Sequence, residues 1–147
     1  MENPAPDPAV DSASAVDPAP APVDPMVEAA ERRRARGRLE ELAQALDRFQ
    51  ERDVAAWGGA PWRELEATIE RGRGHFAERR WTAALQAWEP TEAALEGLEA
   101  DRRRALENAM ASASTALGRG DAGAARASYE AALRIDENAW FVNNPFS

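Results

Sequence analysis

The chain of 147 residues contains no cysteine and a single histidine. Without thiols it has no disulfide framework, thiolate zinc site or thiol nucleophile, and one imidazole cannot make a two-histidine metal site. No apolar run approaches the roughly 18 residues that a membrane span needs. The first residues show neither a basic region nor an apolar run, so we expect no signal peptide and a cytoplasmic protein.

Lysine is also absent, and all 18 basic residues are arginine. This usage is typical of a GC-rich bacterial genome, so we expect a bacterial protein. Large apolar side chains are few: alanine occurs 34 times, whereas Leu, Ile, Val and Phe together number 22. That proportion is close to the range of disordered chains, although five tryptophans and ten leucines indicate that part of the chain packs.

Proline and charge divide the chain into three parts. Residues 1–25 hold seven of the ten prolines and five acidic residues, with no basic residue. Proline removes backbone donors and favours extended neighbours. We therefore predict a disordered tail at 1–25, a helical domain at 26–138 and an aromatic segment at 139–147. As a proline-rich ligand for a recognition domain, the tail would lack the basic or aromatic residues that give such ligands specificity.

The middle part is rich in Ala, Leu, Glu and Arg and poor in β-branched residues, which predicts an all-α fold. Apolar residues recur every three or four positions between Gly and Pro punctuation, and they place about five helices. The expected ranges are 26–57, 61–77, 81–88, 91–117 and 122–136. Pro25 is expected in the first turn of the first helix, and Asp121 is expected to cap the last one.

The last two predicted helices and the turn between them carry a repeat-like set of residues: Ala113, Gly120, Asp121, Ala125, Tyr129 and Ala132. On these residues, the segment 106–138 resembles a tetratricopeptide repeat, whose 34-residue unit is a helix-turn-helix. The family's closing proline is Glu137 here, and the aromatic and leucine of its first helix are Ala109 and Ser112. A fainter copy lies upstream, with the small and aromatic positions at Gly72, Trp81, Ala84 and Trp88.

The resemblance implies a short solenoid of helical hairpins, because such hairpins bury their apolar faces only against neighbours. It also implies scaffolding and protein binding, with a concave face built by the first helix of each pair. By family position, that face would carry Glu66, Arg73, Glu107 and Ser114.

The C-terminal segment concentrates the large aromatics Trp140, Phe141 and Phe146 around an Asn-Asn-Pro break. An exposed cluster of this kind needs a cover. Either it folds back over the last hairpin as a cap, or it docks on a partner or a second copy of the chain. The expected function is a protein–protein interaction module or adaptor that binds a partner protein or peptide. The alternative is a structural subunit or fragment of a larger assembly.

Other features have both a structural and a functional interpretation. His75, with Glu78 one turn later, is a structural residue or a general base. The tryptophans form a core or a ligand cage. The arginine runs form solvated helix faces, a carboxylate site, or contacts to nucleic acid or lipid; the net acidic domain argues against nucleic acid. Because no nucleophile–base pair, phosphate loop or metal cluster is visible, we expect no enzyme activity and no cofactor.

Overall fold

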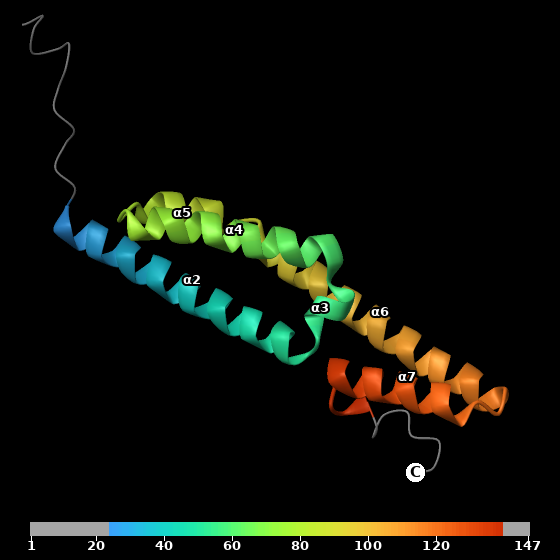
Figure 1. The fold of residues 1–147 in the computed structure, drawn as a ribbon. Coiled ribbons are helices and arrows are strands. Elements are labelled where there is room, and N and C mark those ends of the chain that lie inside the picture. The colour runs from blue at the N-terminus through green and yellow to red at the C-terminus, as the bar shows by residue number, and fades with distance from the viewer. Residues whose placement is uncertain (1–23, 140–147) are drawn as a thin grey trace, which may run out of the picture.

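The structure is a computed structural model that describes residues 24–139. The tail predicted at 1–25 and the aromatic segment predicted at 139–147 lie outside the described residues, apart from the positions at their inner ends. Residues 24–139 form helices and no strand, which confirms the all-α prediction (Figure 1). The six helices are α2 (Pro25–Glu51), α3 (Val54–Trp57), α4 (Gly59–Ala77), α5 (Trp81–Ala87), α6 (Thr91–Gly118) and α7 (Ala122–Ile135).

The first helix differs from the prediction. A single helix up to residue 57 is wrong, because α2 ends at Glu51 and the one-turn helix α3 follows. Between them Asp53 takes the left-handed conformation (φ 62°), which interrupts the hydrogen-bond ladder. Trp57 closes this corner: its Nε1 donates to the Arg52 carbonyl oxygen at 2.8 Å, and its ring meets Phe49 edge-on. The other predicted helices agree with the observed bounds to within two residues.

Aspartates cap two of the helices. The Asp24 carboxylate accepts a hydrogen bond from the Met26 amide at 2.9 Å, and Pro25 follows in the first turn of α2. The Asp121 carboxylate accepts from the Ala124 amide at 3.0 Å. Each carboxylate satisfies a backbone donor that the first turn of a helix leaves without an internal partner. Both starts are as predicted.

Helices α2, α4, α5 and the first half of α6 form a bundle with one apolar core. Its most buried large side chains include Leu42, Leu65 and Leu98. The ring of Trp62 meets Phe49 edge-on, with centroids 6.1 Å apart. Trp62 and Trp88 are buried members of this core, which confirms the core interpretation for these two tryptophans and leaves them unable to form an open cage.

A close contact in the bundle joins α4 to the end of α5. Trp88 Nε1 donates to the Ile69 carbonyl oxygen at 3.0 Å, and the indole lies directly over Gly72. A Cβ atom at position 72 would overlap the indole ring. The glycine is therefore required by packing at the crossing of the two helices, where the resemblance places a small residue.

The second half of α6 leaves the bundle and pairs with α7, so that the molecule is elongated (Figure 1). The buried residues of this α6–α7 hairpin are mostly alanines, namely Ala113, Ala116, Ala125, Ala132 and Ile135. Small side chains allow close packing but bury little apolar area. Helix α6 thus serves two units, packing on α4 with its beginning and on α7 with its end.

Candidate functional site

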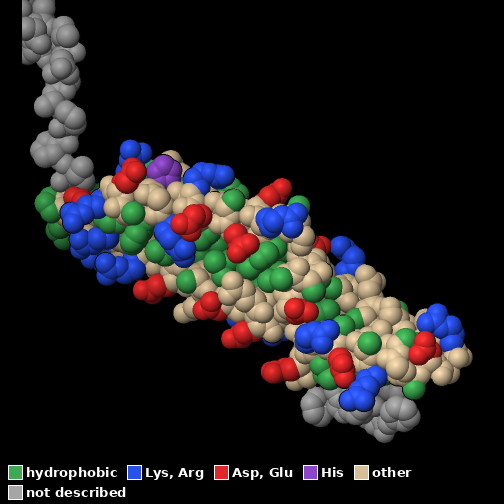
Figure 2. Space-filling view, viewed as in Figure 1, with side chains coloured by type: hydrophobic (Ala, Val, Ile, Leu, Met, Phe, Trp, Pro, Cys, Tyr) green, Lys and Arg blue, Asp and Glu red, His purple; other side chains and the backbone are tan. Residues whose placement is uncertain are grey.

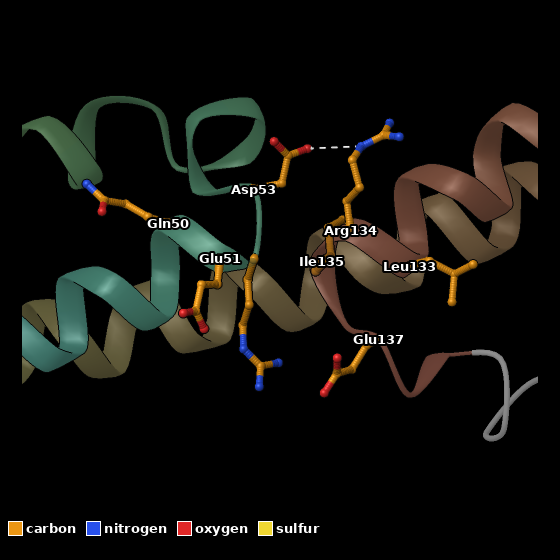
Figure 3. A pocket seen from close by; sticks show the side chains of 8 residues that line it. Gln50, Glu51, Asp53, Leu133, Arg134, Ile135 and Glu137 are labelled. Carbon is orange, nitrogen blue, oxygen red and sulfur yellow. Dashed lines mark ion pairs between the residues drawn. The ribbon is translucent and has the colours of Figure 1, made fainter.

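A cleft opens where the bundle meets the hairpin. Its walls come from the end of α2 and the end of α7, and its volume is about 320 Å³. We call it the junction cleft. It is lined by Gln50, Glu51, Arg52, Asp53, Leu133, Arg134, Ile135 and Glu137. Figure 3 shows Asp53 and Arg134 reaching toward each other at one side, where Arg134 Nε lies 3.5 Å from Asp53 Oδ2. Both acidic and basic side chains line the cleft, so it presents no single sign of charge to a ligand.

A second ion-pair group fixes the hairpin beside this cleft. Arg102 of α6 donates through Nε to the Glu99 carboxylate at 3.0 Å, and its Nη1 lies 3.6 Å from Asp136 Oδ2 at the end of α7. The Arg102 side chain is only 11% exposed. Its Nη1 has no hydrogen-bond partner among the described residues. Arg102 therefore holds the end of α7 by charge attraction and holds Glu99 by hydrogen bonds.

The hydrogen bonds between Glu99 and Arg102 shift the pKa of both groups. The hydrogen bond from Arg102 lowers the pKa of Glu99 below its ordinary value of 4.5, against an opposing effect of burial. The same hydrogen bond raises the pKa of Arg102, again against burial. Both groups are therefore charged at neutral pH.

Acid should weaken the contact between Glu99 and Arg102. Since the folded chain holds a proton on Glu99 less tightly than the unfolded chain does, the stabilisation is complete above about pH 4.5 and is lost as the pH falls through the lower folded pKa. We expect Glu99→Gln to reduce the free energy of unfolding at pH 7, and the difference from the native chain to shrink below pH 4.5. Urea unfolding between pH 7 and pH 3 measures this.

The matched control is Glu96→Gln, an exposed residue of α6 that makes no ion pair within residues 24–139. It should leave the stability at pH 7 nearly unchanged, as surface substitutions usually do. A deficit of Glu99→Gln that stays constant from pH 7 to pH 3 would contradict the assignment of this pH dependence to Glu99.

An apolar groove lies on the outer side of the hairpin. It is lined by Leu117, Ala122, Ala125, Arg126, Tyr129, Glu130 and Leu133, which we call the hairpin face. Leu117 is 43% exposed and Leu133 is 39% exposed, and Tyr129 lies half-buried in the same groove. In α7 the apolar members recur at 122, 129 and 133, the spacing of one side of a helix. This surface offers apolar contact with few charged groups around it.

The residues expected on a concave face are placed apart. Glu66 and Arg73 lie exposed on α4, and Arg73 pairs with Glu70 at 3.0 Å. Glu107 and Ser114 lie exposed on the half of α6 that belongs to the hairpin. Helix α4 starts beside Asp101 and runs away from the hairpin (Figure 1), so the residues expected on one concave face are divided between α4 and the hairpin half of α6. Trp140, Phe141 and Phe146 lie outside the described residues.

The sequence could have indicated part of the hairpin face. Tyr129 matches the aromatic position of the repeat's second helix, and Leu133 follows it by one turn of α7. The repeat's small positions, Ala125 and Ala132, indicate which side of α7 faces α6, and both residues are buried. Ala125 and Ala132 take that side because their small size lets the helices approach, which leaves Tyr129 and Leu133 at the edge.

His75 is half-buried near the end of α4, and no ion pair joins it to Glu78, whose carboxylate contacts Arg80 at 3.1 Å. Within residues 24–139 no three His, Cys, Asp or Glu side chains gather in a way that could hold a metal ion. Over the same range, none of the helices has the length and apolar character of a bilayer span.

Comparison of the chain with protein-family models, with curated proteins and with solved structures finds no match.

Proposed function

We propose that this protein is an all-helical interaction module that binds a partner protein through the hairpin face. The observation that carries the proposal is the exposure of Leu117 and Leu133 beside the half-buried Tyr129 around one apolar groove, uncovered by any other described residue. Clustered apolar exposure at the edge of a domain is typical of protein contact surfaces.

The position of the face supports the same function. The hairpin projects beyond the bundle, so a partner can approach it without displacing any other described helix (Figure 1). Its interior is built from alanines, which bury little apolar area. Added contact on the outer side of α7 would therefore stabilise a unit that has a small core of its own.

The proposal includes a tetratricopeptide-like organisation. Gly72 lies under Trp88 at one helix crossing, and Ala113 and Ala125 are buried at the other, as the family's small positions would require. In a repeat array the side of a hairpin's last helix packs on the next repeat. The hairpin face occupies the side where such a neighbour would pack, and a helical segment of a partner would have the matching shape.

Site-specific photo-cross-linking in the source cells tests the proposal. A benzoylphenylalanine at position 129 or 133 should cross-link to one partner protein of defined mass. The matched control is position 127, which is exposed on the opposite side of the same helix. Equal cross-linking at 127 and 129, no adduct at 129 and 133, or an adduct only to a second copy of this chain would contradict the proposal.

A further inference from the structure

Charge is distributed unevenly along the bundle. Residues 24–36 and 70–82, called here the arginine end, contain eight arginines and five acidic residues. The other described residues contain ten arginines and 17 acidic residues. One end of an otherwise acidic molecule is therefore positively charged. Figure 2 shows arginine side chains gathered over the beginning of α2.

The two segments of the arginine end lie side by side. The Thr82 hydroxyl at the start of α5 donates to the Glu31 carboxylate on α2 at 3.1 Å. Phe76 at the end of α4 meets Trp81 edge-on, with ring centroids 5.1 Å apart. These contacts bring the beginning of α2, the end of α4 and the turn at 78–80 to the same end of the bundle.

The arginines at this end face solvent and are only partly neutralised. All eight are exposed, namely Arg32, Arg33, Arg34, Arg36, Arg71, Arg73, Arg79 and Arg80. Arg73 pairs with Glu70 and Arg80 with Glu78. Within residues 24–139 the other six make no ion pair. The surface can therefore accept further carboxylates without breaking an ion pair among the described residues.

The sequence that enters this end has the opposite charge. Residues 1–23 contain Glu2, Asp7, Asp11 and Asp17 and no basic residue, and they join the bundle at Asp24, within the arginine end. Asp17 lies seven residue steps before Asp24, which is a reach of about 25 Å when extended. Arg32 and Arg36 lie only about 10 and 16 Å along α2 from its start. The nearest carboxylate can thus reach every arginine of the α2 segment.

We propose that the acidic segment 1–23 of this chain is the resident occupant of the arginine end. Its tether raises its effective concentration at this surface to the millimolar range. Guanidinium groups suit carboxylates because their donors match the two acceptor oxygens. An acidic segment of another protein must then compete with residues 1–23 for the same arginines. This surface is distinct from the hairpin face and does not depend on the function proposed there.

The absence of cysteine makes the inference directly measurable. Ser12→Cys gives a single attachment site for a nitroxide spin label in the full chain. The label should broaden the amide signals of residues 70–82, which lie far from the segment in sequence. The signals of 118–121, at the tip of the hairpin, serve as the distant control. In about 500 mM salt, where screening acts over a few ångströms, the broadening at 70–82 should fall by about half or more.

A neutralised segment separates charge from simple tethering. The variant carries Glu2→Gln, Asp7→Asn, Asp11→Asn and Asp17→Asn, and it keeps Asp24 because that side chain caps α2. Broadening at 70–82 should drop in this variant to the high-salt level. Equal broadening in the two proteins at low salt would overturn the proposal. Broadening that appears only between labelled and unlabelled molecules would overturn it in favour of a second copy as occupant.

Competition gives a second, independent measurement. With a ten-residue poly-aspartate peptide as probe, the neutralised variant should bind about threefold to tenfold more tightly than the native chain at low salt, because no resident segment has to be displaced. Adding Arg32→Gln, Arg33→Gln and Arg36→Gln to that variant should remove the gain. Identical affinities of the native and neutralised chains would overturn the proposal.

Discussion

Gly72→Ala is expected to destabilise the protein by about 3 kcal/mol, although alanine is normally the better helix residue. A Cβ atom there would overlap the Trp88 indole, which cannot retreat because Trp88 is buried and its Nε1 is bonded to the Ile69 carbonyl oxygen. Moving the ring would leave a buried N–H and a buried carbonyl without partners, at a cost of about 1–3 kcal/mol. Equilibrium urea unfolding followed by tryptophan fluorescence measures the change.

The same helix provides a control substitution for which we expect a gain in stability instead of a loss. Gly74 lies two residues further along α4, and a Cβ atom there would meet nothing within 4 Å. Gly74→Ala should therefore stabilise the protein by up to about 1 kcal/mol through the helix preference of alanine alone. Two alanine substitutions of equal effect would show that the Gly72–Trp88 contact does not hold α4 against α5.

The second large effect is expected in the hairpin. Ala125→Glu should destabilise α7 by about 3 kcal/mol or more, because the side chain is buried where α7 crosses α6, and a carboxylate there is too large and loses its hydration. Ala127→Glu, exposed on the other side of the same helix, should change stability by less than about 0.5 kcal/mol.

Hydrogen exchange shows which helices lose stability in the Ala125→Glu variant. Amides of α7 should lose protection, whereas those of α4 should keep it, because α7 packs chiefly on α6 and its ion pairs to other parts of the molecule lie near its end. Equal loss of protection in α4 and α7 would mean that bundle and hairpin unfold as one unit. Equal effects of Ala125→Glu and Ala127→Glu on stability would contradict the structure, in which the Ala125 side of α7 packs on α6 and the Ala127 side is exposed.

Local chemistry explains why most of the helices could be predicted. Proline, glycine and aspartate mark the helix ends, and Asp24 and Asp121 make capping hydrogen bonds to residues two or three positions away in the sequence. The break at Asp53 could not be predicted this way. It depends on Trp57 turning back to Phe49 and to the Arg52 carbonyl, which is a contact between segments and not a local preference.

The surroundings of the arginine run could be predicted from the sequence, whereas the positions of the residues expected on a concave face could not. Consecutive helical residues point about 100° apart, so the arginine run at 102–104 spreads around α6. Accordingly Arg102 is nearly buried against Glu99 and Asp136, whereas Arg103 and Arg104 are exposed. The spacing could not show that α6 is shared between two units, because its apolar positions look alike on either side of Asp101. That sharing separates Glu66 and Arg73 from Glu107 and Ser114.

The affinity of the cross-linked partner for purified variants tests the central claim most directly. The native chain and Ala127→Glu should bind it equally, and Leu133→Glu should bind at least about tenfold more weakly, a loss of about 1.4 kcal/mol. Circular dichroism must first show that all three proteins keep the same helix content. If Leu133→Glu retains native affinity, or if Ala127→Glu loses as much, the hairpin face is not the binding surface.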